Sequence, residues 1–290
     1  MKDQLNETHR VDHSLRYWRI LIGPWLGHFL QVVFDRWSML KVAIENYGII
    51  GCKVLLKEES TFIPNDFKHS DNLWIDDKWN EAMYSQLLQE NWKDSFLIEI
   101  IRKNNDQTQQ TYHNNGLSKS FFGRIRKFSG KKYKIYKNHF SHLDKYFFFK
   151  TYLPTTIENE ILFRLGQKPK FWETPNVPKI QANMKMRKWQ IDEADLYDQF
   201  SLIVSRMIPY NIPTVYLDGY NTLLDCIETV GWPKNPKYIF ASNEFFSNEI
   251  FKAWSAQKVE NGTRLIIGQH GGHYGIGLWS WVEEHEISIS

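Results

Sequence analysis

The stretch TRLIIGQHGGHYGIG, Thr263 to Gly277, joins a short strand to a turn rich in glycine and histidine. Residues 264–267 predict the strand, and the glycines after it would let backbone N–H groups approach a phosphate or sugar closely. Parallel sheets bind ligands beyond the carboxyl ends of their strands. Histidine transfers protons near neutral pH. We therefore predict a ligand site in residues 268–277, called the glycine segment below.

Strands and helices alternate before the glycine segment. Tyr238 to Ala241 predicts a strand and Glu244 to Gln257 a helix, capped by Ser242 or Asn243. Further upstream, Thr214 to Leu217 predicts a strand and Asn221 to Val230 a helix. This alternation is typical of parallel strands joined by right-handed crossovers, so we predict an α/β protein with a doubly wound sheet.

A similar unit lies in the first third of the chain. Apolar residues at helical spacing predict a core helix from Leu26 to Tyr47, preceded by a Gly-Pro-Trp turn. Cys52 to Leu56 predicts a strand, Lys78 to Trp92 an amphipathic helix, and Phe96 to Ile101 a second strand. The unit therefore has the β-α-β order of a parallel pair.

Residues 104–141 interrupt this order, and we interpret them as an insertion. Lys119 to Lys137 holds eight Lys and Arg residues among aromatic ones, with no acid. Such a run suits anionic lipid headgroups or phosphate-bearing acceptors, although runs of this kind are more often solvated loops.

The pattern of strands and helices resumes after the insertion. Tyr146 to Tyr152 predicts a strand, and Thr155 with Glu158 predicts a capping box that begins a helix. Leu196 to Met207 predicts another helix, and Ile287 to Ser290 a last strand. We place a domain boundary at Pro233 to Pro236, which divides the chain into residues 1–232 and 233–290.

Composition narrows the function classes. The chain has 290 residues, which suits about two domains. A net charge of +3 is too small to indicate a nucleic-acid partner, and we expect none. The polar start lacks the apolar core of a secretory signal, and Ile20 to Phe34 is too interrupted to span a membrane. We expect a cytoplasmic protein, soluble or peripheral at the inner face of the membrane.

Four blocks of sequence also resemble a known family. These blocks are RILIGPWLGHFLQVVFDRW, YIFASNEFFSNEIFKAWSAQ, IIGQHGGHYGIG and EEHEISIS, and together they resemble the bacterial O-antigen and surface-polysaccharide transferases. The resemblance implies two Rossmann-like lobes of the GT-B glycosyltransferase type with parallel sheets. It also implies a nucleotide-activated sugar or polyol donor, a lipid-linked or glycan acceptor, and no cofactor or bound metal. Family members look longer at both ends, so we expect a middle portion with an incomplete second lobe.

A sugar transferase must deprotonate an acceptor hydroxyl and stabilise charge on the leaving phosphate. We predict that His270 is the base or the donor to the leaving group, that Gln269 orients the substrate, and that Glu284 is a further catalytic residue. Glu284 and His285 could instead bind the donor or hold the glycine segment. The predicted donor-binding residues are Gly271, Gly272, His273, Tyr274, Gly275, Ser242, Asn243 and His285.

The acceptor side is predicted on the first core helix. His28, Asp35 and Arg36 interrupt its apolar stripe, although the same pattern suits an ordinary outward polar face with a pair between Asp35 and an arginine. Asp218, Tyr220 and Asn221 are further candidates, because they follow a predicted strand.

Other readings stay open at this point. His270, His273 and Glu284, in the acidic cluster Glu283 to Glu286, offer ligands for a metal-dependent hydrolase. A non-catalytic scaffold could bind membrane or glycan through Lys119 to Lys137 and exposed aromatic side chains. The glycine segment could also be a structural turn with a hydrogen-bonded histidine.

Overall fold

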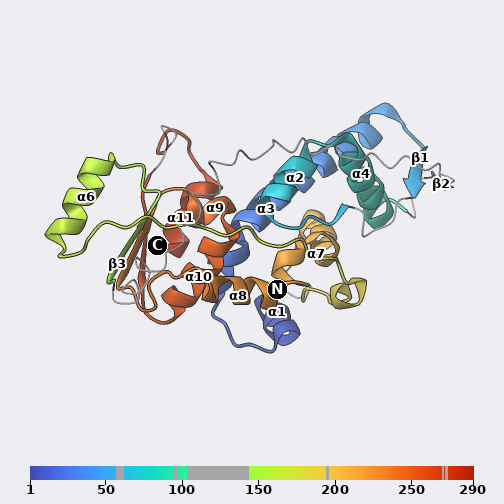
Figure 1. Ribbon diagram of the computed structural model, residues 1–290. Helices are drawn as coiled ribbons and strands as arrows, with labels where there is room; N and C mark the ends of the chain where they lie inside the picture. The colour runs from blue at the N-terminus through green and yellow to red at the C-terminus, as the bar shows by residue number, and fades with distance from the viewer. Residues whose placement is uncertain (57–61, 94–96, 103–143, 194–195, 270, 272–273) are drawn as a thin grey trace, which may run out of the picture.

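The computed structural model describes residues 1–56, 62–93, 97–102, 144–193, 196–269, 271 and 274–290. In this part of the chain two small parallel sheets lie at opposite ends of the molecule, and helices fill the space between them (Figure 1). The predicted mixed α/β class is therefore confirmed.

The larger sheet has the strand order β3-β4-β5. Its strands are β3 (Tyr146–Phe149), β4 (Tyr238–Ala241) and β5 (Arg264–Ile267), and neighbours pair in parallel. All three were predicted, with β3 ending before the predicted Tyr152. A domain boundary at Pro233 to Pro236 would separate β3 from its partner β4, and that boundary stays a prediction.

One face of this sheet is buried against α10 (Glu249–Glu260). The ring of Phe147 lies 4.5 Å from that of Trp254, and Phe149 lies 5.8 Å from Phe251, measured between centroids. The side chain of Gln167 covers the outer edge of β3, since it accepts from the Tyr146 N–H at 3.0 Å and donates to the Tyr146 carbonyl at 2.5 Å. The sheet is thus fixed on one face and along one edge.

The smaller sheet pairs β1 (Gly51–Leu56) with β2 (Leu97–Arg102) in parallel. Its crossover contains α3 (Phe67–Trp74) and α4 (Asp77–Asn91), and the Asp76 carboxylate caps α4 by accepting from the Lys78 and Trp79 N–H groups at 2.9 Å. The predicted β-α-β unit is confirmed, while α3 was not predicted.

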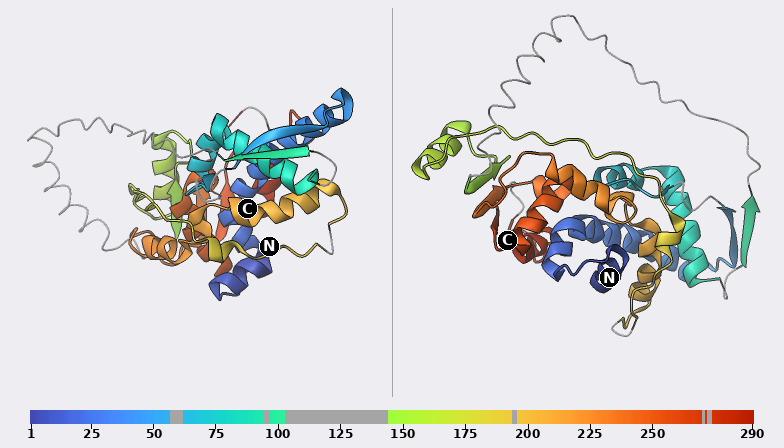
Figure 2. Two further views of the ribbon diagram at one scale, coloured as in Figure 1. Left: turned by 90° about the vertical axis from the view of Figure 1, so that its right-hand side faces the viewer. Right: turned by 60° about the horizontal axis from the view of Figure 1, so that its bottom comes forward.

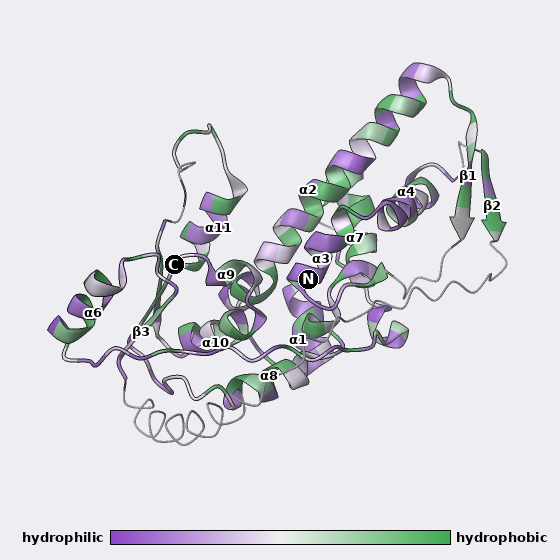
Figure 3. Ribbon diagram, turned by 45° about the horizontal axis from the view of Figure 1, so that its top comes forward, coloured by the Kyte–Doolittle hydropathy of each residue, from purple (hydrophilic) through white to green (hydrophobic). Residues whose placement is uncertain are grey.

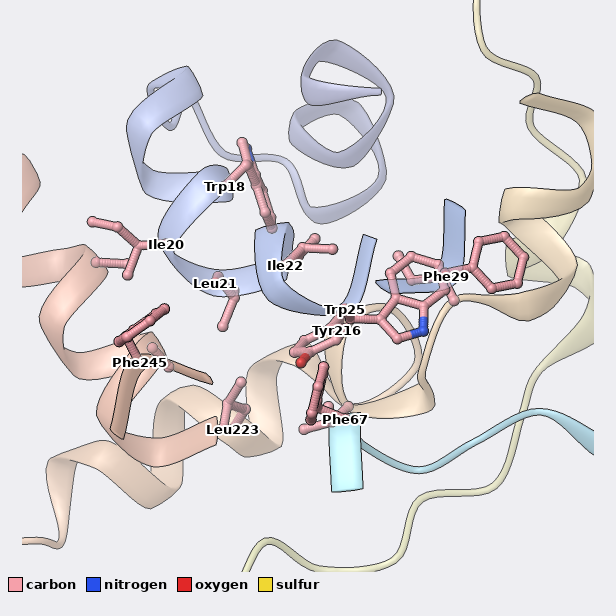
Figure 4. Packing of buried hydrophobic residues seen from close by; sticks show 14 of the residues in the cluster. Trp18, Ile20, Leu21, Ile22, Trp25, Phe29, Phe67, Tyr216, Leu223 and Phe245 are labelled. Atoms are coloured by element: carbon pink, nitrogen blue, oxygen red, sulfur yellow. The ribbon is translucent and has the colours of Figure 1, made fainter. Parts of the chain in front are cut away.

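The long helix α2 (Leu15–Tyr47) runs from the middle of the molecule, where it packs against α10, toward the smaller sheet. Its predicted start at Leu26 after a Gly-Pro-Trp turn is wrong, because the helix runs through Pro24. Proline removes one helical hydrogen bond, but Leu21, Trp25 and Phe29 are at most 1% exposed in the main core (Figure 4). Burial of this face therefore outweighs the local signal. No helix among the described residues is both long and apolar enough to cross a membrane.

The remaining helices gather around α2 and the larger sheet, and α10 contacts both α2 and α8 (Figure 2). They are α1 (Lys2–His9), α6 (Thr155–Arg164), η3 (Met184–Arg187), α7 (Gln199–Asn211), η4 (Thr214–Tyr216), α8 (Tyr220–Glu228), α9 (Glu244–Ser247) and α11 (Trp281–Ile289).

Two predicted strands are wrong. Thr214 to Leu217 forms the 3-10 helix η4 instead, because the N–H groups of Thr214 and Val215 donate to the carbonyls of Pro64 and Asn65 at 2.8 and 3.0 Å. Ile287 to Ile289 belong to helix α11, whose C-cap is Ser290 and whose N-cap Ser280 accepts from the Glu283 N–H.

Asn243, one of the two predicted caps, is the N-cap of α9, although its side chain makes no capping hydrogen bond. Two other predictions about these helices differ. The helix expected from Glu244 to Gln257 divides at Asn248, whose side chain caps α10 by accepting from the Phe251 N–H at 3.0 Å. The capping box at α6 does not form, because Glu158 accepts from the Thr151 hydroxyl at 2.6 Å and Pro154 is the N-cap.

The core contains a buried ion pair behind the larger sheet. Glu249 and Lys252 are 4% and 0% exposed and lie 3.0 Å apart. The Lys252 ammonium also donates to the Tyr216 hydroxyl at 2.7 Å, and Glu249 accepts from the Phe67 N–H at 3.0 Å. Burial raises the pKa of Glu249 and lowers that of Lys252, while each charge partly offsets the shift of the other. The pair ties α10 to α3 and η4.

Candidate functional site

The carboxyl ends of β3, β4 and β5 meet at one edge of the larger sheet. Hydrogen bonds join the residues that follow the strands: the Ser242 hydroxyl donates to the Thr151 carbonyl at 2.7 Å, and the Gly268 N–H donates to the Ala241 carbonyl at 3.0 Å. The structure thus brings the predicted residues after β4 and β5 together, and it adds a third segment after β3. We call this region the sheet edge.

The segment after β3 was missed by sequence reasoning. Lys150 and Tyr152 both have left-handed backbones, with φ of 46° and 58°. Non-glycine residues in this conformation are strained, and such strain clusters at functional sites. The Lys150 ammonium lies 3.1 Å from a Glu244 oxygen, and the Asn243 amide donates to the Tyr152 hydroxyl at 3.3 Å. Because neither residue is glycine, the sequence carries no signal for this turn.

Ser242 and Asn243 differ in their availability for a ligand. The Ser242 side chain is fully buried and its hydroxyl is used by Thr151. Asn243 lies at the surface of the sheet edge beside Tyr152. As donor-binding residues both stay predictions, and the geometry favours Asn243.

The glycine segment begins with a glycine that packing requires. A Cβ on Gly268 would lie 2.8 Å from both the Phe240 ring and the Ser242 hydroxyl oxygen. Gly268 therefore allows β5 to pass close to β4. The next described residues, Gln269 and Gly271, are exposed at the sheet edge. His270, Gly272 and His273 lie outside the described residues, so their predicted roles stay predictions.

Helix α11 holds the end of the glycine segment. The Gly275 N–H donates to a Glu283 oxygen at 3.0 Å, and the Tyr274 hydroxyl donates to a Glu286 oxygen at 2.9 Å. We call these two bonds the turn contacts. Gly275 has φ of 69°, a conformation that suits glycine. The acidic cluster thus holds the turn, but through Glu283 and Glu286, whereas Glu284 is exposed.

His285 faces α2 instead of the sheet edge. A Cβ on Gly23 would lie 3.0 Å from its Nδ1, so the imidazole fills the space that this glycine leaves. Burial, together with the nearby charges of Lys252 and Arg19, lowers the pKa of His285 to about 4. Its neutral, buried ring is a packing group in this structure, and its role in donor binding stays a prediction.

The acceptor-side candidates do not converge on the sheet edge. The His28 ring packs among aromatic rings, including Trp281 at 4.7 Å and Phe246 at 5.0 Å, and burial lowers its pKa. Arg36 pairs with Asp35 at 2.6 Å and donates to Asn80 of α4 at 3.0 Å. These contacts match the alternative of an ordinary polar helix face, and the acceptor role stays a prediction.

The remaining candidates have structural partners or lie outside the described residues. Asp218 follows no strand, and its carboxylate forms a buried ion pair with Arg187. Lys119 to Lys137 lies outside the described residues. Among the residues that the structure describes, no group of three His, Cys, Asp or Glu side chains could hold a metal ion.

One family model, described as LIC12162 family transferase, matches residues 1–290. The chain belongs to this transferase family. No curated protein and no solved structure matches it significantly. The family shows that the reaction is a group transfer. We propose the transferred group and the acceptor below.

Proposed function

We propose that this protein transfers a sugar or polyol phosphate from a nucleotide-activated donor, in the synthesis of O-antigen or another surface polysaccharide. The proposal depends above all on the sheet edge, where three parallel strands end beside the glycine segment that α11 holds. Membership of a transferase family supports it. In this proposal the larger sheet is part of a GT-B lobe, and the enzyme acts in the cytoplasm or at the inner face of the membrane.

The sheet edge offers groups that suit a phosphorylated donor. The Lys150 ammonium is well exposed and could approach a diphosphate. The amides of Asn243 and Gln269 can donate and accept hydrogen bonds, as recognition of sugar hydroxyls requires. These three side chains come from the ends of three strands, so one ligand could contact all of them.

The proposed catalytic group is His270, which follows Gln269 in the chain. A neutral imidazole there would accept the proton of the acceptor hydroxyl, or an imidazolium would donate to the leaving phosphate. Glu284 is proposed as a supporting acid on the exposed side of α11. We propose no metal in this step, and chelation tests that directly.

Calorimetric titration with nucleotide-activated sugars and polyols, with and without chelator, tests the proposal. We expect saturable binding of one nucleotide class that chelator does not change. Gln269→Ala and Lys150→Gln should weaken that binding by roughly tenfold each, as loss of a charged or polar contact does. Gln181→Ala is the matched control, since Gln181 is also exposed but lies in another segment.

Turnover assays then test the catalytic group. Both His270→Ala and His270→Gln should lower kcat by at least about a hundredfold, the usual contribution of a general acid or base. Near wild-type turnover in both variants would contradict the assignment of His270. Absence of binding across the whole donor panel would contradict the proposed substrate class.

A further inference from the structure

The end of the glycine segment and the loop that follows it into α11 expose three large apolar side chains. Ile276 is 77% exposed, Trp279 is 69% exposed, and Leu278 between them is fully exposed. We call these three residues the apolar tip. The loop projects from the body of the molecule before α11 (Figure 3). Apolar side chains gathered at such a point mark an interaction surface.

The apolar tip is held at both ends. On one side the turn contacts fix Tyr274 and Gly275 to α11. On the other side the Trp281 ring fills the space beside Gly27, with its Cε3 atom 2.6 Å from the position of a Cβ there. A loop fixed in this way presents its side chains to a partner with little loss of conformational entropy on binding.

The chemistry of the loop indicates what that partner is. Residues 274–280 contain no charged side chain, so the tip can leave water without the cost of removing a charge from it. Tryptophan favours the headgroup level of a bilayer, and aliphatic side chains favour the acyl region below it. A small convex tip buries little area against a rigid protein surface, whereas a fluid bilayer closes around it.

We propose that the apolar tip inserts into the interfacial region of a lipid bilayer and holds the sheet edge at the membrane surface. This contact needs no spanning helix, and the described residues contain none. It also needs no anionic lipid, in contrast to a contact through Lys119 to Lys137. The inference does not depend on the identity of the donor, so it can be tested separately from the proposed transferase activity.

Cosedimentation of the full chain with phosphatidylcholine vesicles tests the inference. We expect binding to these uncharged vesicles, and we expect the double variant Leu278→Ser with Trp279→Ser to weaken it by roughly tenfold or more. The matched control is Ile75→Ser with Tyr197→Ser, because these side chains are 82% and 90% exposed on other segments. The control should bind as the wild type does.

Brominated phosphatidylcholine provides a second readout. Trp279→Phe keeps an apolar tip and should keep binding, but it should lose most of the fluorescence quenching that the lipid causes in the wild type. Unchanged vesicle binding of the double variant would overturn the inference, as would absence of wild-type binding. Conversion of a dimer to a monomer by the double variant, without an effect on vesicles, would assign the tip to a second copy of the chain and overturn it as well.

Discussion

The substitution Gly27→Ala should weaken the packing of α11 against α2. A Cβ on Gly27 would lie 2.6 Å from Trp281 Cε3 and 3.0 Å from Cη2, whereas carbon atoms in contact prefer about 3.5 to 4.0 Å. The indole ring would have to retreat by roughly 1 Å. The His28 and Phe246 rings, whose centroids lie 4.7 and 6.0 Å from that of the half-buried Trp281, restrict this movement.

Two opposing effects set the size of the change. Overpacking of a well-packed core costs about 1 to 3 kcal/mol of unfolding free energy. Alanine is more favourable than glycine in a helix by about 0.5 to 1 kcal/mol. The difference between the two ranges is about 0 to 2.5 kcal/mol. Because the new Cβ would lie within 2.6 Å of the ring, we expect a steric cost in the upper part of its range, so that Gly27→Ala lowers the free energy of unfolding by about 1 to 2 kcal/mol.

Urea unfolding of single and double variants measures this balance. In a Trp281→Ala background nothing opposes the new methyl group, so Gly27→Ala should there raise the free energy of unfolding by about 0.5 to 1 kcal/mol. Gly27→Ala is therefore expected to lower the free energy of unfolding when residue 281 is tryptophan and to raise it when residue 281 is alanine. If Gly27→Ala stabilises the wild type, or destabilises both backgrounds equally, the packing argument is refuted.

Three further predictions concern the groups around the sheet edge and behind it. Glu283→Ala should speed hydrogen exchange at the Gly275 amide by removing its acceptor, whereas Glu284→Ala, the matched control, should leave that exchange unchanged. Lys252→Met should cost about 3 to 5 kcal/mol in urea unfolding because it leaves Glu249 buried without its cation, and Glu249→Leu in the same chain should restore most of the loss. The pKa of His285 is about 4 in the folded chain and 6.5 in the unfolded one, so its contribution to stability is complete above pH 6.5 and falls as the pH drops toward 4. At pH 5 this loss is about 2 kcal/mol, and His285→Gln should remove that part of the pH dependence; an unchanged slope would contradict the assignment.

The strands of the two described sheets could be predicted because their signals are local. An apolar run bounded by glycine, proline or polar residues marks β4 and β5, and the order of strands and helices predicts parallel pairing. The same local signal failed at Thr214 to Leu217, where a short apolar run suits either a strand or a helical turn. The carbonyls of Pro64 and Asn65, distant in sequence, decided that case.

The candidate site was predicted in position but not in detail. The sequence places Ser242, Asn243 and Gln269 after strands, and parallel strands bring such residues to one edge. It gave no sign of Lys150 and Tyr152, because left-handed backbone at non-glycine residues depends on the contacts around them.

The sequence by itself determined that strands alternate with helices and that a glycine-rich turn follows the last strand, since both depend on the spacing and type of neighbouring residues. Only the tertiary structure decided which residues of α11 accept hydrogen bonds from that turn. Gly23 and Gly27 of α2 leave two spaces four residues apart, and His285 and Trp281 fill them at the same spacing. Because a helix has 3.6 residues per turn, this contact turns Glu283 and Glu286 toward the glycine segment and leaves Glu284 exposed.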